Sequence, residues 1–256
     1  MFRRLRILVL LLVLATVAQS AWLARSRATE WKSSLQVAVY PIAGDGSSAT
    51  AETLSRLREE QFEPIERFLE REARRQGIAT LRPVDVSLAP VVSAKPPDPP
   101  GTRGALDTVL WSLHLRWWAW RHDQTAGPKP QVRLFVLFHD PDRTPALPHS
   151  LGLQKGMIGV VHAFAGPHMA AQNQVVIAHE LLHTLGASDK YDPATNLPVY
   201  PQGYAEPQRQ PRHPQELAEI MGGRVPLSDT EAEMPESLEQ VVVGPETAAE
   251  IGWIRN

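Results

Sequence analysis

The residues most able to do chemistry are two histidines and a glutamate within residues 175–189. His179 and His183 are four residues apart, and Glu180 directly follows the first of them. On an α-helix, where each residue turns by about 100°, residues four apart share a face, so both imidazoles can reach one metal ion. Glu180 is turned off that row, where a carboxylate can take a proton from metal-bound water. The spacing predicts a hydrolytic metal site with Glu180 as general base and later general acid.

The residues that follow the second histidine allow a third ligand. Gly186 stands three residues after His183, and glycine readily adopts the left-handed conformation that ends a helix. The chain can then turn back and present Asp189 to the same ion, with Asp192 as the alternative ligand. Because the chain has no cysteine, the site must be built from imidazole and carboxylate. One Zn2+ ion is expected, since catalytic zinc keeps three such ligands and one open position.

Residues 179–189 read His-Glu-Leu-Leu-His-Thr-Leu-Gly-Ala-Ser-Asp and fit the pattern H-E-x-x-H-x-x-G-x-x-[HD]. This stretch resembles the zinc motif of the metzincin metallopeptidases, in the variant with aspartate as third ligand. Among them it is similar to the snapalysin family. The resemblance covers roughly residues 173–224. It implies a metzincin-like zincin domain, with a twisted sheet, an active-site helix, a methionine turn beneath the metal and a C-terminal helix.

Beyond the zinc motif, one methionine and two tyrosines are candidates for roles in the site. The resemblance makes Met221, which precedes Gly222 and Gly223, the candidate for the methionine turn. The alternative is an ordinary core methionine. Tyr191 or Tyr204 can donate a hydrogen bond to the oxyanion that forms during hydrolysis; alternatively, both only pack.

Hydrophobic patterning places these residues in one mixed α/β (α+β) domain over residues 31–256. Pro64 interrupts the first helical segment, which predicts a kink or two helices there. The strand just before the zinc helix is expected to be an edge strand that binds substrate by β-augmentation, as in the family. Strands are predicted over residues 34–42, 81–92, 132–139 and 157–164, and helices over residues 51–76, 106–122, 173–185 and 248–253.

A long irregular segment separates Asp189 from Met221. Six of the 23 prolines of the chain fall within it, and proline restricts the backbone. Irregular loops of this length are usually functional. We therefore expect this segment to form one wall of the substrate cleft.

Residues 1–30 are predicted to be a signal peptide or a signal anchor. Three arginines among the first six residues precede an apolar run over residues 7–18, which is the form of an export signal. The run can be read on to Ala24, close to the lower limit for a membrane-spanning helix. Both alternatives place the remainder outside the cytoplasm, either membrane-anchored with the N-terminus inside or released after signal cleavage.

The composition is that of an ordinary globular protein and excludes several other classes. Of 256 residues, 43% are hydrophobic and 21% charged, which excludes a disordered or collagen-like chain. The 26 Lys+Arg are balanced by 28 Asp+Glu, which argues against a nucleic-acid partner. The expected partner is a protein or peptide substrate, and the sequence predicts no oligomeric state.

Together these features predict an exported zinc metallopeptidase that acts as an endopeptidase. One alternative is a non-catalytic envelope protein in which zinc is a structural strut with a closed fourth position. Another is a binding module that uses a tryptophan-rich helix with its indoles exposed on one face. The plainer interpretation of that helix is that its aromatic side chains pack on the sheet. The tryptophans concerned are Trp111, Trp117, Trp118 and Trp120.

Overall fold

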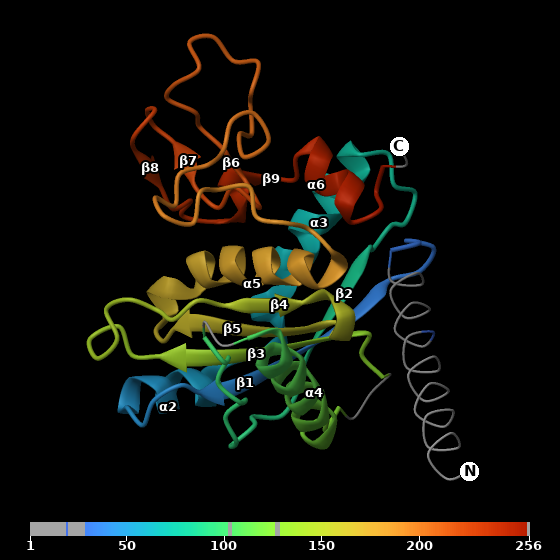
Figure 1. Cartoon of the computed structure of the whole chain (residues 1–256), viewed down its shortest axis with the longest axis vertical. Helices are drawn as coiled ribbons and strands as arrows, with labels where there is room; N and C mark the ends of the chain where they lie inside the picture. Colours follow the sequence, from blue (N-terminus) through green and yellow to red (C-terminus); the bar gives the residue numbers. More distant parts are fainter. Residues whose placement is uncertain (1–18, 20–28, 102–103, 126–128, 255–256) are drawn as a thin grey trace.

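The computed structural model describes residue 19 and residues 29–101, 104–125 and 129–254. They form a mixed α/β domain, as predicted, in which a five-stranded sheet carries helices on both faces (Figure 1). The predicted signal or anchor segment lies almost entirely outside the described residues. Within the described part, no helix is both long enough and apolar enough to cross a membrane.

The sheet has the strand order β2-β1-β3-β5-β4, and only β4 runs antiparallel to its neighbour. Strand β2 is shorter than the predicted 81–92, because Pro83 and Pro90 flank it and proline cannot donate to a ladder. The strands are β1 (Leu35–Ala43), β2 (Val84–Leu88), β3 (Val132–His139), β4 (Leu151–Leu153) and β5 (Ile158–Phe164).

The helical segment predicted over residues 51–76 is two helices, but the break lies before the proline. Helix α2 ends at Arg56, and Pro64 occupies the first turn of α3, where its missing N–H costs nothing. The helices are α2 (Ser48–Arg56), α3 (Glu63–Arg75), α4 (Ala105–Arg121), α5 (Ala170–Leu185) and α6 (Pro245–Glu250), with 3-10 turns η1 (Glu59–Phe62), η2 (Gln154–Gly156), η3 (Pro167–Met169) and η4 (Leu238–Gln240).

Helices α3 and α5 cover one face of the sheet and α4 covers the other (Figure 1). On the first face, Leu134 and Val161 pack in the cluster that contains Leu181 of α5. On the second, Tyr40 and Phe135 pack with residues of α4. Side chains alternate between faces along each strand, so each strand contributes to both clusters.

The strand directly before the zinc helix is not the edge strand, which corrects the expectation for residues 157–164. Strand β5 pairs with β3 on one side and with β4 on the other, so β4 is the edge. Strand β4 has only three residues and contains Gly152, so neither its length nor its composition indicates a strand. It also crosses α5 closely: a Cβ atom on Gly152 would lie 2.4 Å from Cβ of His183.

The C-terminal third is mostly irregular and lies over α5 (Figure 1). It is held by two short ladders and by contacts with the start of the domain. The Trp31 indole donates to the carbonyl of Ile251 at 2.8 Å and meets the Trp253 ring edge-on at 5.5 Å. The final helix α6 begins three residues earlier than predicted. The ladders pair β6 (Ala218–Glu219) with β9 (Val241–Val242) and β7 (Val225–Pro226) with β8 (Ala232–Glu233).

Candidate metal centre

Helix α5 places the two histidines side by side on its outward face. The imidazole rings of His179 and His183 are 4.7 Å apart, and both side chains are mostly buried. The opposite face of the helix carries Leu181, Leu182 and Leu185, which are buried against the sheet. This amphipathic arrangement fixes the helix by its apolar side and leaves the imidazoles directed into the space above it.

Backbone carbonyls orient both imidazoles. Nδ1 of His179 lies 2.8 Å from the carbonyl oxygen of Ile220, and Nδ1 of His183 lies 2.8 Å from that of Ala187. A carbonyl oxygen can only accept, so each Nδ1 carries a proton, and Nε2 is the ring nitrogen that remains for a ligand. Metal-binding histidines are typically held in this way. The Ile220 contact spans 41 positions and was not predicted from the sequence.

Asp189 lies against both histidines, at the place predicted for a third ligand. Gly186 ends α5 in a left-handed conformation with φ of 114°, and the chain turns back as expected. The Oδ1 atom of Asp189 lies 3.2 Å from Nε2 of His179 and 3.0 Å from Nε2 of His183. The alternative ligand, Asp192, instead accepts from the backbone N–H of Ala194 within its own turn.

Glu180 is the second carboxylate beside the imidazoles, and the ligand atoms of His179, Glu180 and His183 all lie within 4.8 Å of one another. This group could hold a metal ion. The Glu180 side chain is buried, and its Oε2 atom has no hydrogen-bond partner among the described residues. Buried polar atoms are nearly always paired, so this oxygen calls for a water, a proton or a ligand. The Oδ1 atom of Asp189 contacts both Nε2 atoms, so Asp189 remains the candidate for the third ligand.

The electrostatics of the two carboxylates differ. Burial raises the pKa of Glu180, and the neighbouring histidines counteract this only in part. Burial also works to raise the pKa of Asp189, but hydrogen bonds from His179 and His183 outweigh it and hold that pKa well below its ordinary value. Asp189 is therefore an anion that faces the imidazoles, whereas Glu180 is suited to exchange a proton.

Met221 is fully buried, and it directly follows Ile220, whose carbonyl orients His179. Its carbonyl accepts from the backbone N–H of Lys190, which ties this segment to the one that carries Asp189. Both the methionine turn and the alternative of a core methionine fit this burial, so the methionine turn stays a prediction.

A buried glutamate that the sequence reasoning missed shapes this turn. Oε2 of Glu219 accepts from the backbone N–H groups of Met221 and Gly222 at 2.7 and 2.8 Å. Its Oε1 accepts from Gly244 and from the Thr247 hydroxyl. The signal available in the sequence was a lone acidic residue beside Ile220 and Met221, which cannot be buried unless it is fully paired.

The two candidate tyrosines are placed differently. The Tyr191 ring lies 6.4 Å from the His179 ring and lines the cavity beside it. Burial, with the charge of Asp189, raises the pKa of Tyr191, so its hydroxyl remains a donor. Tyr204 instead bonds through its hydroxyl to Nε2 of His213 at 3.1 Å, within the proline-rich segment. Of the two, the structure brings only Tyr191 to the histidines.

A cavity of about 260 Å3 opens beside the histidines. Val175 and Val176 of α5 form one wall, and Arg224 and Met234 come from the C-terminal third. The long segment between residues 190 and 220 reaches the cavity only with Tyr191, Asn196 and Ile220, so its prolines form no part of the wall. The segment was predicted to form one wall of the substrate cleft, but only these three residues of it contribute to the wall.

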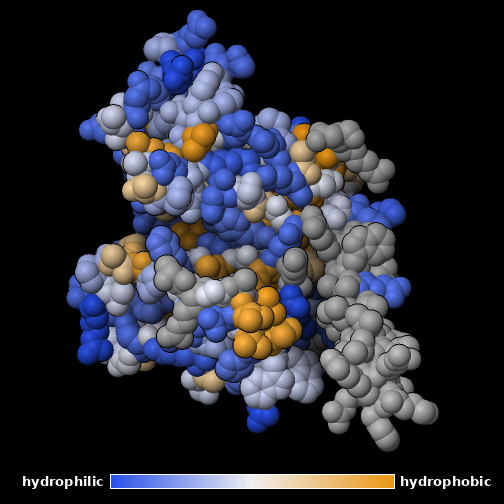
Figure 2. Space-filling model, in the orientation of Figure 1, coloured by the Kyte–Doolittle hydropathy of each residue, from blue (hydrophilic) through white to orange (hydrophobic). Residues whose placement is uncertain are grey.

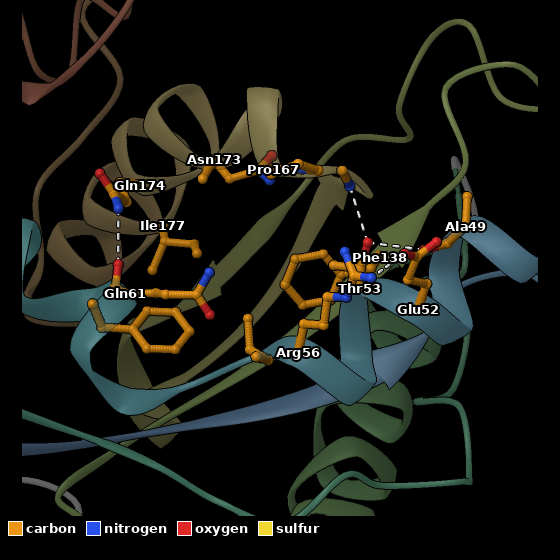
Figure 3. Close-up of a pocket in the computed structure, with 14 residues that line it drawn as sticks. Ala49, Glu52, Thr53, Arg56, Gln61, Phe138, Pro167, Asn173, Gln174 and Ile177 are labelled. Carbon is orange, nitrogen blue, oxygen red and sulfur yellow. Dashed lines mark hydrogen bonds and ion pairs between the residues drawn. The ribbon is translucent and has the colours of Figure 1, made fainter.

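A larger cavity, of about 350 Å3, lies between α2 and the start of α5 (Figure 3). Phe62, Phe138 and Ile177 give it an apolar lining. Its polar groups are already paired: the Gly166 N–H donates to the Thr53 hydroxyl, Gln174 donates to the carbonyl of Gln61, and Arg56 pairs with Glu52. This cavity has volume without a free reactive group, so the candidate site is the smaller cavity at the histidines.

A comparison with models of protein families finds no match for this chain. No curated protein sequence matches it either. The likeness to metzincins therefore rests on the residues of the motif.

Proposed function

We propose that the protein is a zinc-dependent endopeptidase that acts outside the cytoplasm. The observation that carries this proposal is the convergence of two Nε2 atoms and one carboxylate oxygen beside a buried glutamate. Asp189 Oδ1 lies 3.0 and 3.2 Å from the two nitrogens, and the Glu180 Oε2 atom beside them has no partner among the described residues.

The donor set fits zinc. Two imidazoles whose Nε2 atoms face one ionised carboxylate supply the ligand types of catalytic zinc, which needs an open position as well. Because Nδ1 of each histidine is engaged by a backbone carbonyl, the ligand nitrogens are oriented before any ion arrives. When bound there, zinc would lower the pKa of water and polarise a peptide carbonyl.

The remaining roles belong to the side chains of the protein. Glu180 accepts the proton of the attacking water and passes it to the leaving amine, for which its raised pKa suits it. Tyr191 can donate its hydroxyl proton toward the oxyanion. An extended peptide can add to the free edge of β4, which lies against the segment of α5 that carries His183.

The test measures metal content and hydrolysis on the same purified full chain. One equivalent of zinc by mass analysis is expected, together with cleavage of an unfolded protein substrate. Glu180→Gln should keep the zinc and lose hydrolysis by about a thousandfold or more. Cleavage at the unchanged rate, or absence of zinc from the wild-type protein, would reject the proposal. One zinc without any hydrolysis would favour a structural strut.

Two aspartates form a matched pair for the third ligand. Asp189→Asn should lower zinc affinity, because an amide oxygen lacks the negative charge that faces both imidazoles. Asp192→Asn should leave zinc affinity unchanged, since that side chain is engaged in its own turn. The reverse outcome would move the third ligand to Asp192.

A further inference from the structure

Helix α4 has an exposed apolar face along its whole length. Six large apolar side chains point away from the sheet, and among them Trp117 is 52% exposed and Trp120 is 72% exposed. Figure 2 shows apolar side chains gathered over this helix as an orange patch on the lower half of the molecule. The six residues, here called the α4 stripe, are Leu106, Val109, Leu110, Leu113, Trp117 and Trp120.

The α4 stripe is separate from the face that holds the helix on the sheet. At about 100° per residue, its members fall within an arc of roughly 100°. Leu115, Trp118 and Ala119 are buried on the opposite side, and they already fasten α4 to the sheet. The helix is thus apolar on two sides, one of which remains in contact with solvent. Contiguous exposed apolar surface on a soluble domain marks an interaction site.

We infer that the α4 stripe rests on the surface of a phospholipid bilayer. Tryptophans and aliphatic residues with basic residues at their margins are the pattern of helices that lie in a membrane interface. Arg116 and Arg121 lie on opposite margins of the α4 stripe by the same helical arithmetic. The Arg121 guanidinium lies over the Trp117 ring at 5.7 Å, so the charge accompanies the indole toward lipid headgroups.

The dimensions of the α4 stripe favour a membrane over a second copy of the chain. A helix of 17 residues is roughly 26 Å long and about 10 Å wide. Two such faces would bury on the order of 500 Å2, less than half of the roughly 1,200 Å2 of a stable protein interface. Insertion into a bilayer has no such threshold, because its strength grows with the apolar area that is buried.

The predicted N-terminal segment also points to a membrane. The apolar run of the sequence can be read to Ala24, and the domain begins by Trp31, which is packed on Trp253. A retained anchor would leave only a few residues as linker, at most about 20 Å of extended chain. The domain would then be held at the bilayer surface. Because α4 and α5 lie on opposite faces of the sheet, contact through α4 leaves the histidines accessible.

The test exploits the absence of cysteine from the chain and two valines of similar exposure. Val109 in the α4 stripe is 55% exposed and Val199, in the proline-rich segment, is 46% exposed. Val109→Cys and Val199→Cys are labelled separately with an environment-sensitive fluorophore. Each full chain is then reconstituted with vesicles of phosphatidylcholine and phosphatidylglycerol. Aqueous iodide and lipids with brominated acyl chains serve as the two quenchers.

The expected result is that iodide quenches the Val109 label at least about threefold less than the Val199 label, while brominated lipids quench only the Val109 label. Adding Trp117→Ser and Trp120→Ser to the Val109→Cys chain should restore access to iodide. Equal iodide quenching at both positions would overturn the inference. So would shielding from iodide without quenching by brominated lipid, because the α4 stripe would then be covered by protein. Unchanged shielding in the tryptophan variant would also reject it. None of these outcomes depends on zinc or hydrolysis.

Discussion

Helices α4 and α5 cover opposite faces of one sheet and have 17 and 16 residues, yet their outward faces differ in chemistry. Their inward faces are alike, since Leu115 of α4 and Leu182 of α5 are both fully buried. Outward, α5 presents His179 and His183 to a cavity, whereas α4 presents the α4 stripe to solvent. The inward face fixes each helix, and this leaves the outward face free to carry function.

A second pair of histidines lies on β3 and β5, and His162 of this pair differs from His183 in its electrostatics. His139 and His162 share a hydrogen bond of 2.9 Å, and their positions on the strands match those of residues that face α4. Burial, reinforced by His139, lowers the pKa of His162 to about 4. Burial also works against a charged His183, but the hydrogen bond that His183 donates to Asp189 outweighs it and raises the pKa of His183. Asp189 therefore distinguishes the two pairs. The pair on α5 faces an anion and is suited to bind a cation, whereas burial holds the pair on the strands neutral.

The largest expected effect tests whether the inward faces of the two helices are equivalent. Leu182→Ala in α5 and Leu115→Ala in α4 should each lower the free energy of unfolding by about 2–5 kcal/mol, since both side chains are fully buried. Leu110→Ala, in the α4 stripe, should change it by less than about 0.5 kcal/mol. Urea unfolding followed by circular dichroism measures all three. A loss at Leu110 as large as that at Leu115 would show that the α4 stripe is part of the core.

The close crossing of β4 over α5 gives the next largest effect. In Gly152→Ala the added Cβ would lie 2.4 Å from His183 Cβ and 3.1 Å from the carbonyl oxygen of Glu180. Overpacking of this kind costs about 1–3 kcal/mol, and here it also displaces a proposed metal ligand. The control is Gly46→Ala, where an added Cβ meets nothing within 4 Å. Unfolding free energy and zinc affinity should fall together in the first variant only.

Glu219 tests how strongly the turn beneath the site supports α5. In Glu219→Gln one acceptor oxygen becomes an amide donor, so the hydrogen bonds with Met221 and Gly244 cannot all be kept. The adjacent Ile220 carbonyl, which orients His179, should shift. Zinc affinity should fall by about 10–100-fold, the usual cost of losing support around a metal ligand.

Glu72 supplies the matched control for Glu219. It is also buried and accepts a backbone hydrogen bond, from Val243, but it lies on α3, and its hydrogen bonds reach neither Ile220 nor His179. Glu72→Gln should reduce stability without changing zinc affinity. If both variants lower zinc affinity equally, the effect is general loosening rather than a shift of the turn.

Local spacing was sufficient to predict the helix of the site and the turn at Gly186, because both depend on residues a few positions apart. The approach of Asp189 to the imidazoles follows from that turn. The Ile220 carbonyl could not be predicted in the same way, since it reaches His179 from 41 positions away. Strand β4 was missed because it exists only through pairing with β5 and contact with α5. The exposure of the α4 stripe could not be predicted either. Helix α4 is rich in apolar residues, and its sequence does not show which of its faces packs on the sheet.

The smallest expected effect concerns the histidine pair on the α4 side. The folded-state pKa of His162 is about 4, below its ordinary value of 6.5, so the unfolded chain takes up this proton first as pH falls. The stability that depends on neutral His162 is therefore complete above pH 6.5 and is lost progressively between pH 6.5 and about 4. Allowing for partial solvent access, the loss should be about 1–2 kcal/mol.

His162→Gln should remove this part of the pH dependence of the unfolding free energy, whereas His149→Gln, at an exposed position, should leave it unchanged. An unaltered pH dependence in His162→Gln would show that this pair can accept a proton in the folded state, and the contrast between the two histidine pairs would not hold.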